Sequence, residues 1–287
     1  MKKNLIWILA LMMAVLSCKG RQNEVNAQVA DGLYEATQSQ QAEQKKARNE
    51  KIRSEKAKTV RMYEIPAPLT DRPEQILYRK GYTTSYNSNT KTPNWVAWHL
   101  TDRHTRGTAK RNMQVFTEDS DIVGKRATNN DYYNSRYDRG HMCPAGDNKW
   151  DEEAMRETFL FTNICPQNHG LNKYEWNDLE ILCREWAQRY GAIDIVCGPI
   201  FSEKAQQKMI GKNQVWVPDA FFKVILCRQG KAKAIGFVYR NEGKKQLMED
   251  AVCTVDEIEK LTQMDFFPEL DDVTEVRVEA QAMLSDW

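Results

Sequence analysis

Short apolar runs separated by Gly, Pro or polar residues dominate the chain from about residue 63 onward. Five of these runs are rich in β-branched and aromatic residues and therefore predict strands, at residues 94–101, 192–201, 215–218, 220–228 and 232–240. The last two runs flank Gln229-Gly230-Lys231, a turn sequence that predicts a hairpin. The pattern therefore favours a sheet in which several neighbouring strands are antiparallel.

Two other segments have helical spacing. Residues 171–191 predict a helix with one apolar face, formed by Trp176, Leu179, Cys183, Trp186 and Tyr190 and ended by Gly191. Residues 254–264 begin with the capping box Thr254-x-x-Glu257, which predicts a shorter helix. Strands and helices together predict an α+β fold with a central antiparallel sheet flanked by helices.

The first 62 residues follow a different pattern. Residues 1–17 combine two lysines with an apolar run that is too short to span a membrane and is typical of a signal peptide. Ser17 before Cys18 resembles the bacterial lipoprotein signal, in which the cysteine is lipidated, although a chance cysteine is the alternative. Residues 18–62 are rich in Gln, Glu, Lys, Arg and Ala and predict a charged, solvated tether. We therefore expect an exported protein anchored by lipid at the bacterial cell envelope, with full secretion as the alternative.

Residues 63–287 are long enough for one large domain with its own core. Residues 1–62 hold 12 of the 41 Lys and Arg of the chain but only 6 of its 40 Asp and Glu. The domain itself is therefore net acidic. A polyanionic substrate would have to be attracted by a local basic patch or a bound cation, because overall charge does not attract it.

The cysteine count bears on compartment and chemistry. Six cysteines follow Cys18, at positions Cys143, Cys165, Cys183, Cys197, Cys227 and Cys253. An even count in an exported chain favours disulfides, but the sequence does not select the pairing. The absence of a CxxC pair makes a thiolate zinc site a poor interpretation.

The remaining polar motifs suggest phosphodiester chemistry. His141, one of only four histidines, lies within YNSRYDRGHMCPAGDN at residues 133–148, where a loop histidine is the plainer alternative. Residues 159–172 are dense in amides, whose oxygens can ligate a hard cation, unless they only form a polar turn. Glu180 and Arg184 are one helical turn apart, as in an ordinary surface ion pair. A base, a cation site and a charge clamp are the parts of a metal-assisted phosphodiesterase.

Taken in order, these motifs resemble the DNA/RNA non-specific endonuclease family, whose members include the mitochondrial endonuclease G. The resemblance rests on Asp138-Arg139-Gly140-His141, Thr162-Asn163, Pro166-Gln167, Asn172, Trp176, Glu180 and Arg184. It covers most of residues 63–287, because further segments resemble the family in the same order, at residues 94–101, 110–112, 197–201, 217–225 and 254–262. The implied fold is a ββα-metal (His-Me) finger embedded in a larger mixed, mainly antiparallel sheet.

The resemblance also implies roles in the finger. His141 would be the general base that takes a proton from water, and an unperturbed histidine gains its own proton near about pH 6.5. Gly140 would allow a backbone geometry that other residues resist. Asn163 would orient the finger or the histidine, and Asp138 would have a supporting structural role.

The other motif residues would hold the cation and the substrate. Asn172 would be the one protein ligand of a Mg²⁺ ion, with Mn²⁺ or another divalent cation as alternatives, and Glu180 would hold a metal-bound water. Arg139, Arg184 and Arg111 would bind substrate and stabilise the negative charge that builds on phosphorus.

The implied activity is internal cleavage of DNA and RNA to 5′-phosphorylated ends, with no small-molecule cofactor and with homodimerisation left open. His169, next to the amides, is a rival base. Two readings from other classes remain open: an inactive, tethered nucleic-acid-binding protein, and a surface scaffold with a nuclease-like domain.

Overall fold

The structure, a computed structural model, describes residues 43–44, 47, 49–51, 61–202 and 206–287. The few described residues before 52 are helical and belong to a different compact unit from the rest. The expected signal peptide, Cys18 and most of the expected tether lie outside the described residues. Within the described part, no helix combines the length and apolar character needed to cross a membrane.

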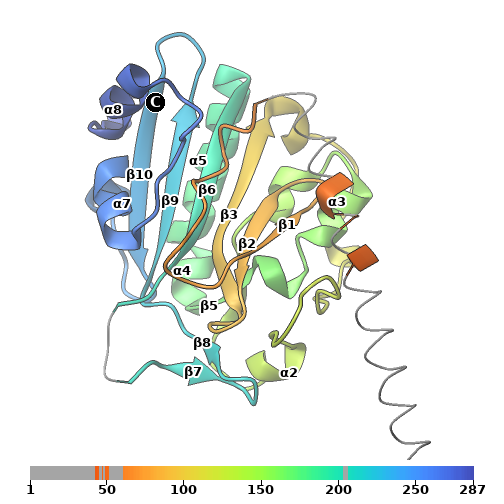
Figure 1. Cartoon of the computed structure of the whole chain (residues 1–287). Helices are drawn as coiled ribbons and strands as arrows, with labels where there is room; N and C mark the ends of the chain where they lie inside the picture. Colours follow the sequence, from red (N-terminus) through yellow and green to blue (C-terminus); the bar gives the residue numbers. More distant parts are fainter. Residues whose placement is uncertain (1–42, 45–46, 48, 52–60, 203–205) are drawn as a thin grey trace, which may run out of the picture. The chain divides into compact units, whose positions relative to one another are not determined.

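The main sheet has seven strands in the spatial order β1-β2-β3-β6-β9-β10-β11 (Figure 1), and every neighbouring pair is antiparallel. The strands are β1 (Gln75–Tyr78), β2 (Thr83–Asn87), β3 (Thr92–Thr101), β6 (Ala192–Ile200), β9 (Ala220–Cys227), β10 (Lys233–Arg240) and β11 (Val252–Cys253). The α+β class is confirmed, and β9 and β10 form the predicted hairpin. β1 and β2 were not predicted, because β2 consists largely of polar residues that are nevertheless all buried.

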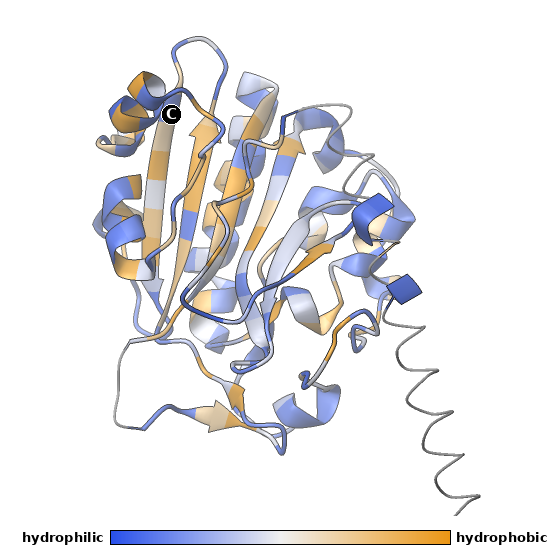
Figure 2. Cartoon of the chain, viewed as in Figure 1, coloured by the Kyte–Doolittle hydropathy of each residue, from blue (hydrophilic) through white to orange (hydrophobic). Residues whose placement is uncertain are grey.

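Helices cover both faces of this sheet (Figure 1). On one face, α5 (Glu175–Tyr190) packs its predicted apolar stripe against β3, β6, β9 and β10. The opposite face is covered by α7 (Val255–Thr262) and α8 (Asp272–Glu279). Neighbouring residues of β9 alternate between the layers, so that Phe221 packs with α5 and Phe222 with α7. Figure 2 shows the hydrophobic residues concentrated in the central strands.

The predicted helix at residues 171–191 is wrong as a single element, because it is two helices. α4 (His169–Lys173) and α5 meet at Tyr174, whose φ of −112° and ψ of −89° are not helical. Contacts on either side explain the break, since α4 is tied to the finger strand through Asn172 while α5 is fixed on the sheet by its apolar stripe. Gly191 ends α5 with φ +83°, as a glycine after a helix commonly does.

The remaining elements connect these layers. They are η1 (Asp102–Thr105), η2 (Arg111–Met113), α2 (Asn129–Tyr132), β4 (Asp138–His141), η3 (Ala145–Asn148), α3 (Glu152–Glu157), η4 (Phe161–Asn163), β5 (Ile164–Gln167), β7 (Met209–Ile210), β8 (Val215–Trp216), α6 (Met248–Ala251) and η5 (Leu284–Asp286). The predicted capping box of α7 is confirmed, because Thr254 Oγ1 accepts from the Glu257 N–H at 3.1 Å and the Glu257 carboxylate accepts from the Thr254 N–H at 2.8 Å.

The expected disulfides are wrong, because all six described cysteines are free. Five of them are buried, and each of the six belongs to a different part of the fold. Burial raises the pKa of the Cys183 and Cys197 thiols to about 12. These cysteines therefore serve as small apolar core residues.

Candidate active site

A two-stranded antiparallel ribbon, β4 with β5, stands apart from the main sheet, and α4 follows β5 directly. This strand–strand–helix unit is the predicted ββα finger. Gly140 is needed there for space, because a Cβ atom at this position would overlap the Gln167 side chain. The expected special backbone geometry of Gly140 is wrong, since its φ does not lie in the left-handed region.

His141 is the last residue of β4 and is only 7% exposed. Its ring centroid lies 4.8 Å from that of Phe159 and 5.3 Å from that of Phe116. Burial, and secondarily the positive charge of Arg111, lowers the pKa of His141 to about 3. The Nε2 atom has no hydrogen-bond partner among the described residues. The imidazole is therefore neutral, which is the form of histidine that can accept a proton, and its Nε2 is not satisfied as in an ordinary loop histidine.

The low pKa leads to a direct prediction. NMR titration of the histidine ring carbons should show that His141 stays neutral from pH 8 down to about 5, well below the ordinary midpoint of about 6.5. Burial disfavours the charged ring, and Arg111 repels it. Assignment follows from the resonance lost in His141→Gln. A midpoint near 6.5 for that resonance would contradict the buried, arginine-flanked environment.

Asn163 holds the backbone that follows the histidine. Its Oδ1 accepts from the Cys143 N–H at 2.8 Å, while its Nδ2 donates to the Cys143 and Thr158 carbonyl oxygens, each at 2.8 Å. The side chain is fully buried, and none of these three hydrogen bonds involves the His141 ring. Asn163 therefore has the geometry of a positioning residue that fixes the end of β4, rather than of a group that touches substrate.

Asn172 lies on α4 and faces the start of β4. Its Nδ2 donates to Asp138 Oδ2 at 2.9 Å, and the same oxygen lies 2.9 Å from His169 Nδ1. Asp138 thus links the finger strand to the helix, which agrees with its expected supporting role. His169 is 69% exposed and bound to this carboxylate, so its surroundings differ from the enclosed setting of His141.

The structure does not bear out a simple surface pair between Glu180 and Arg184. Arg184 Nη1 instead donates to Asp147 Oδ1 at 3.0 Å, and Asp147 is buried, with its second oxygen accepting from Trp98 Nε1 at 3.0 Å. Burial raises the pKa of Glu180 to about 7, against the lowering effect of Lys223, Arg184 and Arg111. Arg184 is therefore held in place by the buried carboxylate of Asp147, a partner that the sequence spacing did not predict.

Lys223 is a further residue of this region that the sequence motifs did not predict. It lies on β9, is fully buried, and its Nζ has no hydrogen-bond partner among the described residues. Nζ lies 4.4 Å from the Trp176 ring centroid and 5.5 Å from that of Trp98. Its charge lowers the pKa of both Asp147 and Glu180, although burial dominates each. A lysine inside the apolar run AFFKVILC was the available signal.

The other two arginines, Arg139 and Arg111, are associated with His141. Arg139, next but one to His141 on β4, has its Cζ 5.0 Å from the Phe116 ring centroid, and Phe116 also packs on His141. Arg111 is exposed on η2 and acts electrostatically on both His141 and Glu180. The structure therefore places Arg139 beside the aromatic contact of His141, while Arg111 and Arg184 both act electrostatically on Glu180.

The donors around Asn172 fit a hydrated divalent cation. Its NH₂ group is engaged by Asp138, which leaves the amide oxygen, a hard donor, for a cation. In the described part of the chain, the one cluster of three His, Cys, Asp or Glu side chains close enough to chelate a metal lies elsewhere, at Asp256, Glu259 and Glu279. A single amide oxygen is a ligand that a hard divalent cation can use when its other ligands are water.

The fold and the finger together define a ββα-metal nuclease architecture, and comparison with known proteins gives the family. The model of the DNA/RNA non-specific endonuclease family matches residues 61–273. The chain belongs to this family.

Its relatives are nucleases by name. The chain is 37% identical over 205 residues to mitochondrial nuclease EXOG of Xenopus laevis, covering 66% of this chain and 57% of the relative. It is 31% identical over 209 residues to human mitochondrial endonuclease G, covering 68% and 70%. A crystal structure of the EndoG/EndoGI complex matches 77% of this chain and 92% of that chain, with a TM-score of 0.69 and 26% identity. The chain spans less than two thirds of the length of the EXOG relatives.

Proposed function

We propose that the protein is an exported, Mg²⁺-dependent endonuclease that hydrolyses DNA and RNA without strong sequence preference and leaves 5′-phosphate ends. The observation that carries the proposal is His141, held neutral by burial and by Arg111, with Nε2 unengaged by any described residue. Nuclease relatives over most of the domain support the same activity.

In the proposed reaction, His141 accepts a proton from a water molecule, and the oxygen of that water attacks phosphorus. The bond between phosphorus and the 3′-oxygen breaks, and the 3′-oxygen takes a proton from solvent. The products are a 5′-phosphate and a 3′-hydroxyl. A bound divalent cation would supply positive charge to the phosphate and the departing oxygen. Asn172 would hold the cation through its amide oxygen, and Glu180 would hold one of the surrounding waters.

The arginines would stabilise the negative charge on the reacting phosphate. Arg184 is oriented by Asp147, and Arg139 is restrained beside Phe116, so both guanidinium groups are partly ordered before substrate arrives. Side chains that contact only phosphates do not distinguish one base from another. None of the proposed roles uses the 2′-hydroxyl, so the same site serves DNA and RNA.

The end groups test this chemistry. Purified protein is incubated with Mg²⁺ and a short DNA duplex or an RNA of the same sequence, and the products are identified by mass spectrometry. We expect internal cuts that carry 5′-phosphate and 3′-hydroxyl ends on both polymers. Products with 3′-phosphate ends would contradict departure of the 3′-oxygen. No products at all would favour an inactive binding or scaffold protein.

We further propose a lipid anchor at Cys18 that holds the enzyme at the bacterial cell envelope. The proposal rests on the signal-like residues 1–17 and on Cys18 alone. Full-length protein should partition into the detergent phase with membranes, while Cys18→Ser should be released or accumulate as precursor. Equal soluble recovery of both forms would show that Cys18 carries no anchor.

A further inference from the structure

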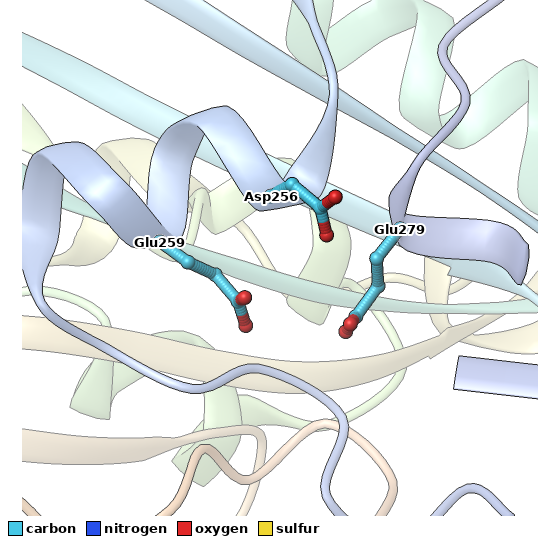
Figure 3. Close-up of side chains that lie close together, drawn as sticks. All are labelled: Asp256, Glu259 and Glu279. Carbon is cyan, nitrogen blue, oxygen red and sulfur yellow. The ribbon is translucent and has the colours of Figure 1, made fainter. Parts of the chain in front are cut away.

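A second group of acidic side chains lies on the face of the sheet opposite to the finger. Asp256 and Glu259 belong to α7, and Glu279 is the last residue of α8. Their carboxylates point toward a common space between the two helices (Figure 3). One oxygen from each lies within 4.8 Å of the other two. Three carboxylates from two helices therefore converge at a distance that a single cation can bridge.

Glu279 shows that the cluster is more than a set of surface acids. Its side chain is only 6% exposed, and its Oε1 has no hydrogen-bond partner among the described residues. Burying a carboxylate oxygen without a hydrogen-bond partner costs free energy of folding, because the oxygen loses its hydrating water and gains no protein hydrogen bond. The Glu279 carboxylate points into the space that Asp256 and Glu259 also face (Figure 3).

The surrounding charges increase this cost. Burial, followed by the charges of Glu259, Glu275, Asp256 and Asp265, raises the pKa of Glu279 to about 9. Burial also raises the pKa of Glu259 to about 7, with further carboxylates adding to the effect. The nearby cation on α8, Arg277, donates to the Ala232 carbonyl oxygen at 2.9 Å rather than to these carboxylates.

We propose that Asp256, Glu259 and Glu279 form a Ca²⁺ site that is separate from the catalytic centre. All three donors are hard oxygens, which suit Ca²⁺ and disfavour zinc or copper. Asp256 and Glu259 are partly exposed, so water can complete an irregular coordination shell that Ca²⁺ tolerates and Mg²⁺ does not. Glu259 is held in place by the Phe266 N–H, which donates to its Oε1 at 2.8 Å.

The site would attach α8 to the rest of the domain. Few apolar contacts hold this helix, because Val273 and Val276 are exposed and its buried residues are Val278 and Glu279. A cation shared between α7 and α8 would replace carboxylate repulsion by attraction between the two helices. The structure thus assigns Ca²⁺ a stabilising role that does not depend on the nuclease reaction.

The test compares Ca²⁺ binding by calorimetry and melting temperature in the full chain. The asparagine of the catalytic finger is first replaced, Asn172→Ala, so that the signal comes from elsewhere. In this background Ca²⁺ should still bind and raise the melting temperature. Glu279→Gln should weaken Ca²⁺ binding at least about tenfold, because affinity follows ligand charge. In EDTA, the same variant should melt no lower than its parent, because a carboxyl with a pKa of about 9 is already uncharged at neutral pH when no cation is bound.

Two further variants make the result decisive. Glu259→Gln keeps the oxygen that accepts from Phe266 and should lose the Ca²⁺ response in the same way, which covers a Glu279 variant that fails to fold. Glu269→Gln, an exposed acid outside the cluster, should keep the full response. No Ca²⁺ response in the Asn172→Ala parent, or a response that survives in the cluster variants, would overturn the proposal and leave Glu279 as a protonated acid.

Discussion

His141→Ala is expected to cleave DNA and RNA at least about a hundredfold more slowly than the wild type, because general-base catalysis typically contributes about 10² to 10⁴ in rate. The loss should be similar for both polymers, since the proposed base acts on water and not on the 2′-hydroxyl. Initial rates on plasmid DNA and on an RNA of comparable length measure it. Substrate binding should persist, because Arg139, Arg184 and Arg111 remain.

The matched control is His169→Ala. His169 is exposed and bound to Asp138, so its replacement should leave the rate within a few fold of wild type. If His141→Ala cuts plasmid at the wild-type rate while His169→Ala does not, the two histidines exchange roles and the mechanism proposed for His141 is wrong.

Asn172→Ala is expected to weaken Mg²⁺ binding severely and to slow turnover, with the fold intact. Alanine removes the amide oxygen proposed to be the one protein ligand of the ion. The rate measured as a function of Mg²⁺ concentration should require far more Mg²⁺, while circular dichroism stays unchanged. An unaltered Mg²⁺ titration would remove Asn172 from the cation site.

This substitution also removes one of two contacts on Asp138. His169→Ala removes the other, so it serves here as a second control. If Asn172→Ala acted only by disturbing Asp138, then His169→Ala would cause a comparable loss. A loss confined to Asn172→Ala would instead place the effect at the amide oxygen.

Much of the fold could be predicted from local pattern. Strands β3, β6, β9 and β10 are rich in β-branched and aromatic residues, which predict strands directly. The capping box of α7 is also a local pattern, because its two residues are three positions apart. Strand β2 was not predicted, because its polar residues are buried only through contact with neighbouring strands. The division between α4 and α5 was not predicted for a similar reason, since Asn172 is held by Asp138, which is distant in sequence.

The sequence points to the motif residues of the candidate site but not to the residues that contact and support them. Arg184 could be singled out by its spacing from Glu180, but its partner Asp147 is 37 residues away, and only the folded chain brings them together. Lys223 stands out as a charge within an apolar strand, but only the folded chain shows that it lies near Asp147 and Glu180. The aromatic enclosure that lowers the pKa of His141 likewise depends on packing between separate segments.

The most direct test of the central claim is cleavage of supercoiled plasmid by the purified protein in Mg²⁺ and, in parallel, in EDTA. We predict nicked, linear and then fragmented DNA with Mg²⁺, equal degradation of a control RNA, and no cleavage of either with EDTA. Intact plasmid in Mg²⁺ under conditions where the protein binds it, or cleavage that EDTA leaves undiminished, would contradict the proposal of a cation-dependent endonuclease.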